Sequence, residues 1–249
     1  MKFHAHHLIA PLVAIAAPLA PASAMTVQPV VVDLRTAGRE MSQIITVENT
    51  FSRQLPVELT VQELELTADG VKGTGKDPGD LLVFPPQALI EPGQTQTFRV
   101  QYVGDPALAR SKHYYVTVAQ LPVKLPEGQS AIQILYNFQV LVSVAPTGAK
   151  PALSVVSATV GHNKDGQPVP VVTLSNASPA HGYLSNGQLR VVARDAAGKQ
   201  VYSHTLSGPD IQQTMGFGLV GGGQTRQVTV PLPLPAGSTA VEAGYTAGN

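Results

Sequence analysis

The stretch AIQILYNFQVLVSVAP, residues 131–146, decides the fold class of this chain. Every even-numbered residue from Ile132 to Val144 is apolar, whereas four of the six odd-numbered residues between them are polar. An alternation with a period of two residues is typical of a β-strand with one buried face. The stripe is thirteen residues long, while most strands in globular proteins have about 5–6 residues. Because one small sheet does not need so long a stripe, we expect part of it to have a second use.

The rest of the chain repeats short strand-like runs rich in Val, Thr, Ile and Leu, and helix signals are nearly absent. In the first half these runs predict strands near residues 26–34, 41–49, 56–66, 81–84, 95–103, 113–121 and 131–145. In the second half they predict strands near residues 153–160, 169–175, 188–194, 200–206, 225–230 and 238–245. Such a series of short strands is typical of immunoglobulin-like sandwiches. The sequence therefore predicts an all-β protein with two β-sandwich domains, residues 25–146 and a smaller one at 152–249, joined by a linker at 147–151.

The first segment, residues 1–24, has the layout of a secretory signal peptide. It carries Lys2, an apolar run around Leu8–Leu19 and the small-residue end Ala22–Ala24, which predicts cleavage after Ala24. The apolar run contains two prolines and is too short to span a bilayer comfortably. We therefore expect a soluble exported protein. The chain has no cysteine, so its stability has to come from burial alone.

Composition and motifs speak against several other functions. The 16 basic and 16 acidic residues balance, which leaves no electrostatic footprint for nucleic acid. Residues 216–221, GFGLVG, have the glycine spacing of a dinucleotide-binding turn, but a strand-like run follows instead of a helix, so a flexible loop between strands is predicted. The histidines after the signal peptide are scattered without metal-ligand spacing: His113, His162, His181 and His204. We expect no enzyme, no cofactor, no metal and no small-molecule substrate.

Several motifs occur in order along the chain. The strongest is VFPPQALIEPGQTQTFRVQY, residues 83–102, in which Pro-Pro and Glu-Pro-Gly separate strand-like runs. The others are Val47–Thr50, Gln54–Pro56, Tyr114–Pro122, Leu174–Pro179 and Tyr183. Together with the long stripe, these motifs resemble those of the periplasmic pilus-assembly chaperones of the chaperone–usher pathway. The resemblance is strong in the first domain and looser in the second.

The resemblance implies two immunoglobulin-like domains set at an angle, with a cleft between them. It also implies a periplasmic chaperone that binds pilus or fimbrial subunits and delivers them to an outer-membrane usher. Subunits in these systems lack the last strand of their sandwich, and the chaperone lends its seventh strand, here residues 131–139, to fill the groove. The lent side chains would be those of Ile132, Ile134, Tyr136 and Phe138. The even-numbered residues from Val140 to Val144 would stay in the chaperone's own core.

The residues with which the family anchors a subunit's terminal carboxylate are replaced in this chain. The typical member uses an Arg on the first strand and a Lys on the seventh, and these positions fall on Val31 and Leu141. Neither side chain can form a charge-assisted bond with a carboxylate, so the chain either resembles a divergent branch or keeps the family fold with a lost or altered chaperone role. Gln120 stands where many members have an acidic residue, so a salt bridge near the domain interface is expected to be missing. The candidate replacements for the anchor, each of which can equally be an ordinary surface charge, are Arg35, Arg39, Arg110 and Lys112.

Two alternatives stay open at this point. The whole apolar stripe from Ile132 to Val144 can belong to the chain's own core, in which case nothing is lent. The chain can also be a two-domain immunoglobulin-like extracellular adhesion or structural subunit, although such a subunit should have an N-terminal extension and an incomplete sandwich. A self-capped oligomer is a further open alternative for the client-free protein.

Overall fold

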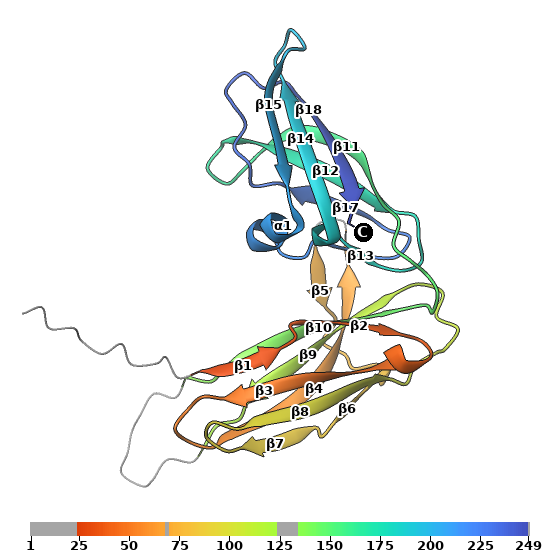
Figure 1. Ribbon diagram of the computed structural model, residues 1–249, viewed down its shortest axis with the longest axis vertical. Helices are drawn as coiled ribbons and strands as arrows, with labels where there is room; N and C mark the ends of the chain where they lie inside the picture. The colour runs from red at the N-terminus through yellow and green to blue at the C-terminus, as the bar shows by residue number, and fades with distance from the viewer. Residues whose placement is uncertain (1–23, 68–69, 124–133, 249) are drawn as a thin grey trace, which may run out of the picture.

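The computed structural model describes residues 24–67, 70–123 and 134–248. The fold class predicted from the sequence is confirmed, because almost all regular elements are strands and they form two β-sandwich domains. Figure 1 shows the second domain, in green to blue, standing at an angle on one side of the first domain. Strands β1–β10 make up the first domain and strands β11–β18 the second.

The first domain consists of two packed sheets. One has the strand order β1-β3-β8-β6, with β1 at Met25–Gln28, β3 at Ser42–Asn49, β8 at Thr95–Tyr102 and β6 at Leu81–Phe84. The other has the order β2-β10-β9-β4-β5, with β2 at Val31–Arg35, β10 at Asn137–Ala145, β9 at Lys112–Gln120, β4 at Leu55–Leu66 and β5 at Val71–Gly73; β7, at Gln87–Ile90, also pairs with β4. A single turn of 3-10 helix, η1, at Arg39–Met41, follows β2.

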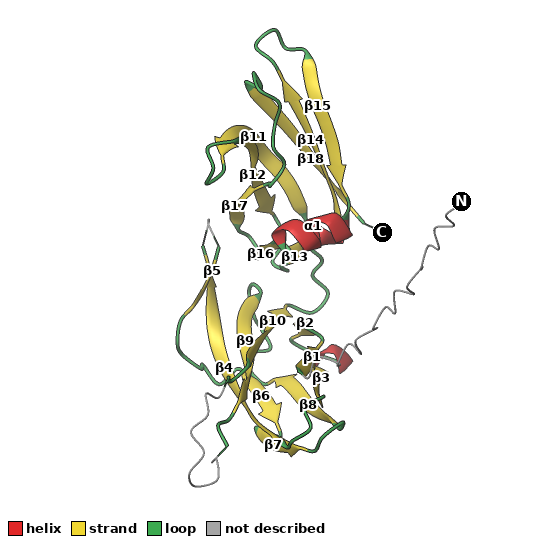
Figure 2. Cartoon of the chain, turned by 90° about the vertical axis from the view of Figure 1, so that its left-hand side faces the viewer, coloured by secondary structure: helices red, strands yellow, loops and turns green. Residues whose placement is uncertain are grey.

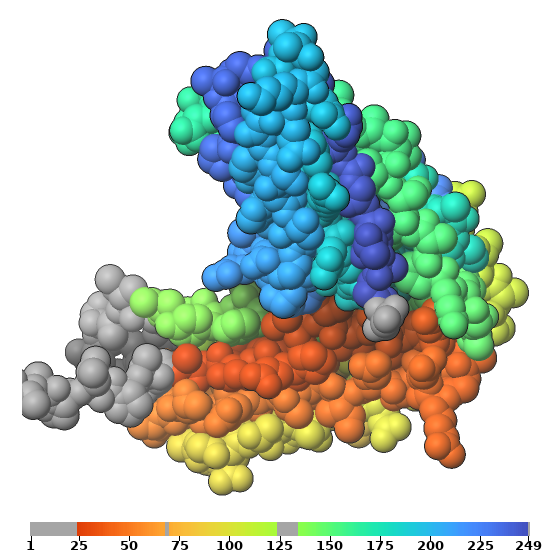
Figure 3. Space-filling model, turned by 45° about the horizontal axis from the view of Figure 1, so that its top comes forward, coloured from red at the N-terminus to blue at the C-terminus, as the bar shows by residue number. Residues whose placement is uncertain are grey.

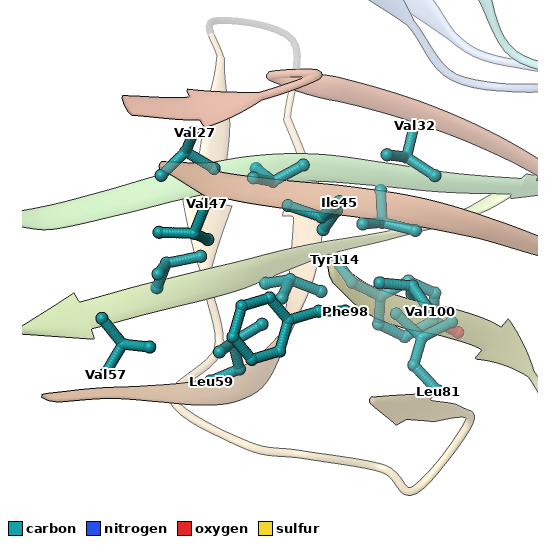
Figure 4. Packing of buried hydrophobic residues seen from close by; sticks show 14 of the residues in the cluster. Val27, Val32, Ile45, Val47, Val57, Leu59, Leu81, Phe98, Val100 and Tyr114 are labelled. Atoms are coloured by element: carbon teal, nitrogen blue, oxygen red, sulfur yellow. The ribbon is translucent and has the colours of Figure 1, made fainter. Parts of the chain in front are cut away.

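The core of the first domain follows from the alternation along its strands. Ile45 and Phe98 point inward from one sheet, and Val57, Leu59 and Tyr114 point inward from the other (Figure 4). Four of these five side chains are fully buried, and Leu59 is 6% exposed. Burial of one such large apolar side chain contributes about 1.5–3 kcal/mol.

The second domain packs two three-stranded sheets. One has the order β11-β12-β17, with β11 at Leu153–His162, β12 at Pro168–Asn176 and β17 at Thr225–Thr229. The other has the order β15-β14-β18, with β15 at Gln200–Leu206, β14 at Gly187–Arg194 and β18 at Ala240–Ala247. A short pair, β13 at Gly182–Tyr183 and β16 at Leu219–Val220, and the 3-10 turn η2 at Leu184–Asn186 lie at the end that faces the first domain.

One helix, which the sequence analysis did not predict, lies at the same end of the second domain. Helix α1 spans Gly208–Met215 (red in Figure 2) and begins with a capping box between Ser207 and Asp210. It ends at Gly216, whose φ of 73° suits glycine. The prediction that residues 216–221 form a flexible loop between strands is therefore wrong, since they follow a helix and include β16. Within the described residues, no helix is long and apolar enough to cross a membrane.

The long strand predicted at 131–145 is shorter in the structure. Strand β10 begins at Asn137. Residues 134–136 precede it and belong to no sheet, while residues 131–133 lie outside the described part. The physical reason is the length of the neighbouring strand, because β9 ends at Gln120. The last backbone bond of the pair runs from the Gln120 N–H to the Tyr136 carbonyl, at 2.9 Å.

A buried asparagine fixes the turn after β3 in the first domain. The Asn49 side chain is fully buried; its amide donates to the carbonyls of Arg53 (2.8 Å) and Ile90 (2.9 Å), and its oxygen accepts from the Phe51 N–H (2.9 Å). Asn176 at the end of β12 does the same in the second domain, where it accepts from Ala152 and Ser178. Both asparagines therefore satisfy buried or half-buried backbone groups.

We expect Asn49→Ala to lower the free energy of unfolding by about 2–4 kcal/mol, because it leaves three buried or half-buried backbone groups unpaired. Urea unfolding of the mature chain measures this loss. Asn137→Ala, at an exposed position, is the control and should stay within about 0.5 kcal/mol of the unmodified protein. Equal stability of the two variants would show that Asn49 does not hold the turn.

Candidate functional site

The chain leaves an apolar segment uncovered just before β10. Ile134 is 66% exposed, Leu135 43% and Tyr136 38%. Tyr136 keeps one backbone bond to Gln120, and its ring centroid lies 6.0 Å from that of Phe51. In Figure 3 the light-green atoms at the left, which include this segment, lie open along the edge of the first domain below the second. Ile132, which the sequence analysis also placed in the lent stripe, lies outside the described residues.

One edge of β10 is open next to this segment. On one side, β9 pairs with β10 from Asn137 to Val144. On the other side, β2 runs parallel and pairs only from Leu141 to Ala145. In the described part of the chain, no strand pairs with this second edge of β10 between Asn137 and Val140. The structure thus places exposed apolar side chains beside a free row of backbone donors and acceptors.

The apolar stripe divides into an exposed part and a buried part. Val140, Val142 and Val144 are fully buried in the core of the first domain. Phe138 is half-buried and packs against that core. The alternative that the whole stripe belongs to the chain's own core is therefore wrong for Ile134 and Tyr136.

Val31 and Leu141, the two positions at which the family's anchoring cations were expected, lie next to each other. They are register partners across β2 and β10, and Leu141 is also the partner of Tyr115 on β9. All three side chains are half-buried and lie on the face of the sheet opposite the core. The row is uncharged, so it offers no cation to a carboxylate.

The four candidate replacement cations are spread over different surfaces. Lys112 lies in register with the buried Val144 and pairs with Asp80 at 2.8 Å, so its side chain is on the core side of the sheet. Arg39 is exposed in η1, and exposed Arg110 lies against Gly223 of the second domain. Arg35 faces the second domain but donates to the Ala149 carbonyl at 3.0 Å.

A cluster of polar side chains joins the two domains in the row next to Val31 and Leu141. Asp33 on β2 is the register partner of Ser143 on β10, which is the partner of His113 on β9. From the second domain, His181 Nε2 lies 2.8 Å from Asp33 Oδ1, and the Tyr183 hydroxyl donates to the same oxygen at 2.8 Å. The Tyr183 hydroxyl is also 3.2 Å from Ser143 Oγ, and His113 Nδ1 is 2.9 Å from that oxygen.

The cluster continues on both sides. Ser111, just before β9, donates its N–H to the Pro179 carbonyl at 2.9 Å, and its Oγ lies 2.9 Å from His181 Nδ1. On the other side, a pocket of about 250 Å³ opens between the domains beside Asp33, Arg35 and Tyr183. The interface between the domains is therefore built on hydrogen bonds rather than on a row of cations.

Burial and hydrogen bonding set the charges in this cluster. Burial lowers the pKa of His113 to about 3, and the nearby His181 adds to this effect. Burial would raise the pKa of Asp33, but the hydrogen bonds and the charge of His181 and the bond from Tyr183 hold it below its usual value. Burial raises the pKa of the Tyr183 hydroxyl. At neutral pH His113 is therefore uncharged and Asp33 is ionised.

The sequence analysis missed this cluster. It treated the histidines as scattered, but the ring centroids of His113 and His181 are 5.3 Å apart. Even so, the described residues contain no group of three or more His, Cys, Asp or Glu side chains that could hold a metal ion. Gln120 does not lie near the domain interface as expected, because it ends β9 at the opposite end from Ser111.

Residues 24–150, just over half of the chain, match the family model described as the N-terminal domain of the PapD pili and flagellar-assembly chaperones. This chain belongs to that family. It is a chaperone of pilus assembly with two immunoglobulin-like domains. No curated protein matches the chain in a sequence comparison.

Solved structures agree with the fold of this chaperone. The class 5 fimbriae chaperone CfaA has a TM-score of 0.53 at 9% identity, covering 88% of this chain and 98% of that one. A chain of the Acinetobacter baumannii CsuC–CsuE chaperone–tip adhesion subunit complex has 0.52 at 13%, covering 90% and 98%. A chain of the Salmonella enterica complex of SafA pilin with the SafB chaperone has 0.52 at 13%, covering 92% and 98%. At these identities the matches show the fold alone.

The division of the stripe predicts different effects of two truncations on stability. Phe138→Ala should lower the free energy of unfolding by about 1–3 kcal/mol, because Phe138 packs on the chaperone's core. Ile134→Ala, at a side chain that is 66% exposed, should change it by less than about 0.5 kcal/mol. Urea unfolding of the client-free protein compares the two. A loss at Ile134 as large as that at Phe138 would mean that the open segment packs on its own domain in solution.

Proposed function

We propose that this protein is a periplasmic chaperone that lends residues 131–139 to pilus or fimbrial subunits and passes them to an outer-membrane usher. Residues 1–24 serve as the signal peptide and are removed after Ala24. The observation that carries the proposal is the exposed Ile134–Tyr136 segment beside the unpaired edge of β10. Strand addition uses both features, because backbone hydrogen bonds supply affinity and alternate side chains supply fit.

The energetics favour lending over a permanently bare segment. Ile134 and Tyr136, if buried in a subunit, would contribute about 1.5–3 kcal/mol each. Left bare beside an open edge, they would invite aggregation. Two of the similar structures are complexes of a chaperone with a pilin or with a tip adhesion subunit. They support the same class of client here.

The last residue of a subunit strand that pairs with the lent strand would meet an apolar surface of this chaperone. A subunit strand that pairs with the free edge of β10 must stop where β2 begins, at Val30 and Val31. Val30 is 51% exposed, and the adjoining Val31 and Leu141 are half-buried. The subunit's last residue is therefore received by apolar side chains. Of the four candidate cations, only Arg35 lines the pocket between the domains, and it lies beyond Asp33 on the same strand.

The lending is tested by the double variant Ile134→Asp and Tyr136→Asp, produced together with a pilus subunit of the host. Two carboxylates cannot enter an apolar groove without a large desolvation penalty, so the amount of soluble subunit in the periplasm should fall at least tenfold. The readout is the subunit recovered on the affinity-tagged chaperone.

Val156→Asp with Val201→Asp is the matched control, because these side chains on the second domain are 62% and 38% exposed. The control should recover as much subunit as the unmodified chaperone. Unchanged recovery with the Ile134 and Tyr136 variant would refute lending.

If apolar side chains contact the last residue of the subunit, the stability of the complex should depend little on salt concentration. Ion pairs at a partly exposed site weaken as the ionic strength rises, while apolar contacts do not. The fraction of subunit retained on the tagged chaperone should therefore change less than twofold between 50 mM and 1 M NaCl. Arg35→Ala should leave that fraction unchanged. A steep loss with salt, together with a loss in Arg35→Ala, would assign the anchor to Arg35 instead.

A further inference from the structure

In the part of the chain that the structure describes, His113 lies in the domain interface with a partner on only one of its ring nitrogens. Its side chain is 3% exposed; Nδ1 contacts Ser143 Oγ, while Nε2 is buried and has no hydrogen-bond partner among the described residues. His181, in contrast, has a partner on each ring nitrogen, Ser111 on one side and Asp33 on the other. The two rings meet edge to face, with an interplanar angle of 85°.

The groups around His113 do not compensate a positive charge on it. Ser143 on β10 and Tyr183 on β13 present hydroxyls, and Leu64, its register partner on β4, presents an apolar side chain. Among the described residues, the titratable groups that act on it are His181, which opposes protonation, and Asp33, which favours it. Arg35 on β2 is a cation that acts on Asp33. Oδ1 of Asp33 is already in contact with His181 and Tyr183.

Separation of the domains removes the cover from His113. Its ring lies on the face of the sheet that meets the second domain, since the neighbouring Tyr114 points into the core. In the open arrangement the ring meets water and takes up a proton near its ordinary pKa of 6.5, whereas the closed interface holds the pKa at about 3. Between these two pH values the closed arrangement binds one proton fewer than the open one. Acid therefore favours the open arrangement.

We propose that Asp33, His113 and His181 form an acid-sensitive lock that holds the two domains together at neutral pH and releases them as the pH falls. At neutral pH, Asp33 binds His181 and Tyr183 across the interface, and uncharged His113 fits beneath them. In acid, His113 binds a proton when the interface opens, which it does not do in the closed arrangement. The lock lies one register row from Val31 and Leu141, so it controls the geometry of the cleft as well. This inference does not depend on the identity of the client.

Amide hydrogen exchange of the client-free protein measures the lock directly. The Ser111 N–H donates across the interface to Pro179, so its protection reports the closed arrangement. Two amides with partners inside one domain serve as references, Leu59 bonded to Pro86 in the first domain and Asn176 bonded to Gln224 in the second. After correction for intrinsic exchange, protection of Ser111 should fall about 50-fold between pH 6.5 and 4.5, since one linked proton approaches a factor of ten per pH unit only below pH 6.5. Protection of the references should fall far less.

His113→Asn tests the origin of the effect, because its amide can still bond to Ser143 but cannot take up a proton. The pH-dependent loss at Ser111 should disappear in this variant, to less than about threefold over the same range. His162→Asn is the matched control, because His162 is exposed on β11 of the second domain. It should keep the roughly 50-fold loss of the unmodified protein.

If His113→Asn also loses protection at Leu59, the first domain of this variant is unfolded. The lock is then tested by the ring-proton resonances of His113 in the unmodified protein. In the locked protein these resonances stay unshifted from pH 7.5 to the pH at which protection of Ser111 is lost. Titration of the ring near pH 6.5 with Ser111 still protected would overturn the proposal. An equal pH dependence of Ser111 and the two references would overturn it as well.

Discussion

The unequal pairing of the two edges of β10 is the constraint on which the rest of this structure depends. One edge is bonded to β9 along almost the whole strand, whereas β2 covers the other edge only from Leu141 onward. The covered half places its even-numbered side chains in the core, and this fixes the strand's register. Because the strand is continuous, the same register sets which side chains of the uncovered half face each side of the sheet. The direction of the side chains in any added strand is therefore decided before a client arrives.

The same sheet face changes character from one end of β10 to the other. Near the free edge it carries Gln139 and Asn137, in the middle the apolar pair Leu141 and Val31, and near the linker the hydrogen-bonded row of Ser143 and Asp33. Charged side chains begin at this row, where Asp33 contacts His181 of the second domain and Arg35 follows on the same face of β2. Hydrogen bonds of this kind impose direction, so they fix one domain arrangement better than an apolar contact would.

Periodicity was enough to predict the sandwiches, because alternation along a strand is a local property of the sequence. The same reasoning missed α1, although Ser207, Asp210 and Gly216 carry its start and stop signals in the sequence. Eight residues with one buried side chain, Ile211, give too little apolar pattern to notice. The polar cluster was out of reach for another reason. Asp33 and Tyr183 are 150 residues apart, and only the parallel register of β2 and β10 and the packing of two domains bring them together.

The apolar anchor positions and the polar row beside them are physically linked. Residues 31 and 33 point to the same face of β2, separated by about 6.6 Å. An arginine at position 31 would reach the carboxylate of Asp33 and compete with His181 for it. That competition would weaken the contact across the domain interface, and the new cation would itself be half-neutralised as an anchor. With Val31 and Leu141 in place, Asp33 is left to the second domain. The apolar surface at Val31 and Leu141 and the Asp33–His181 contact that joins the domains therefore belong to one arrangement on β2.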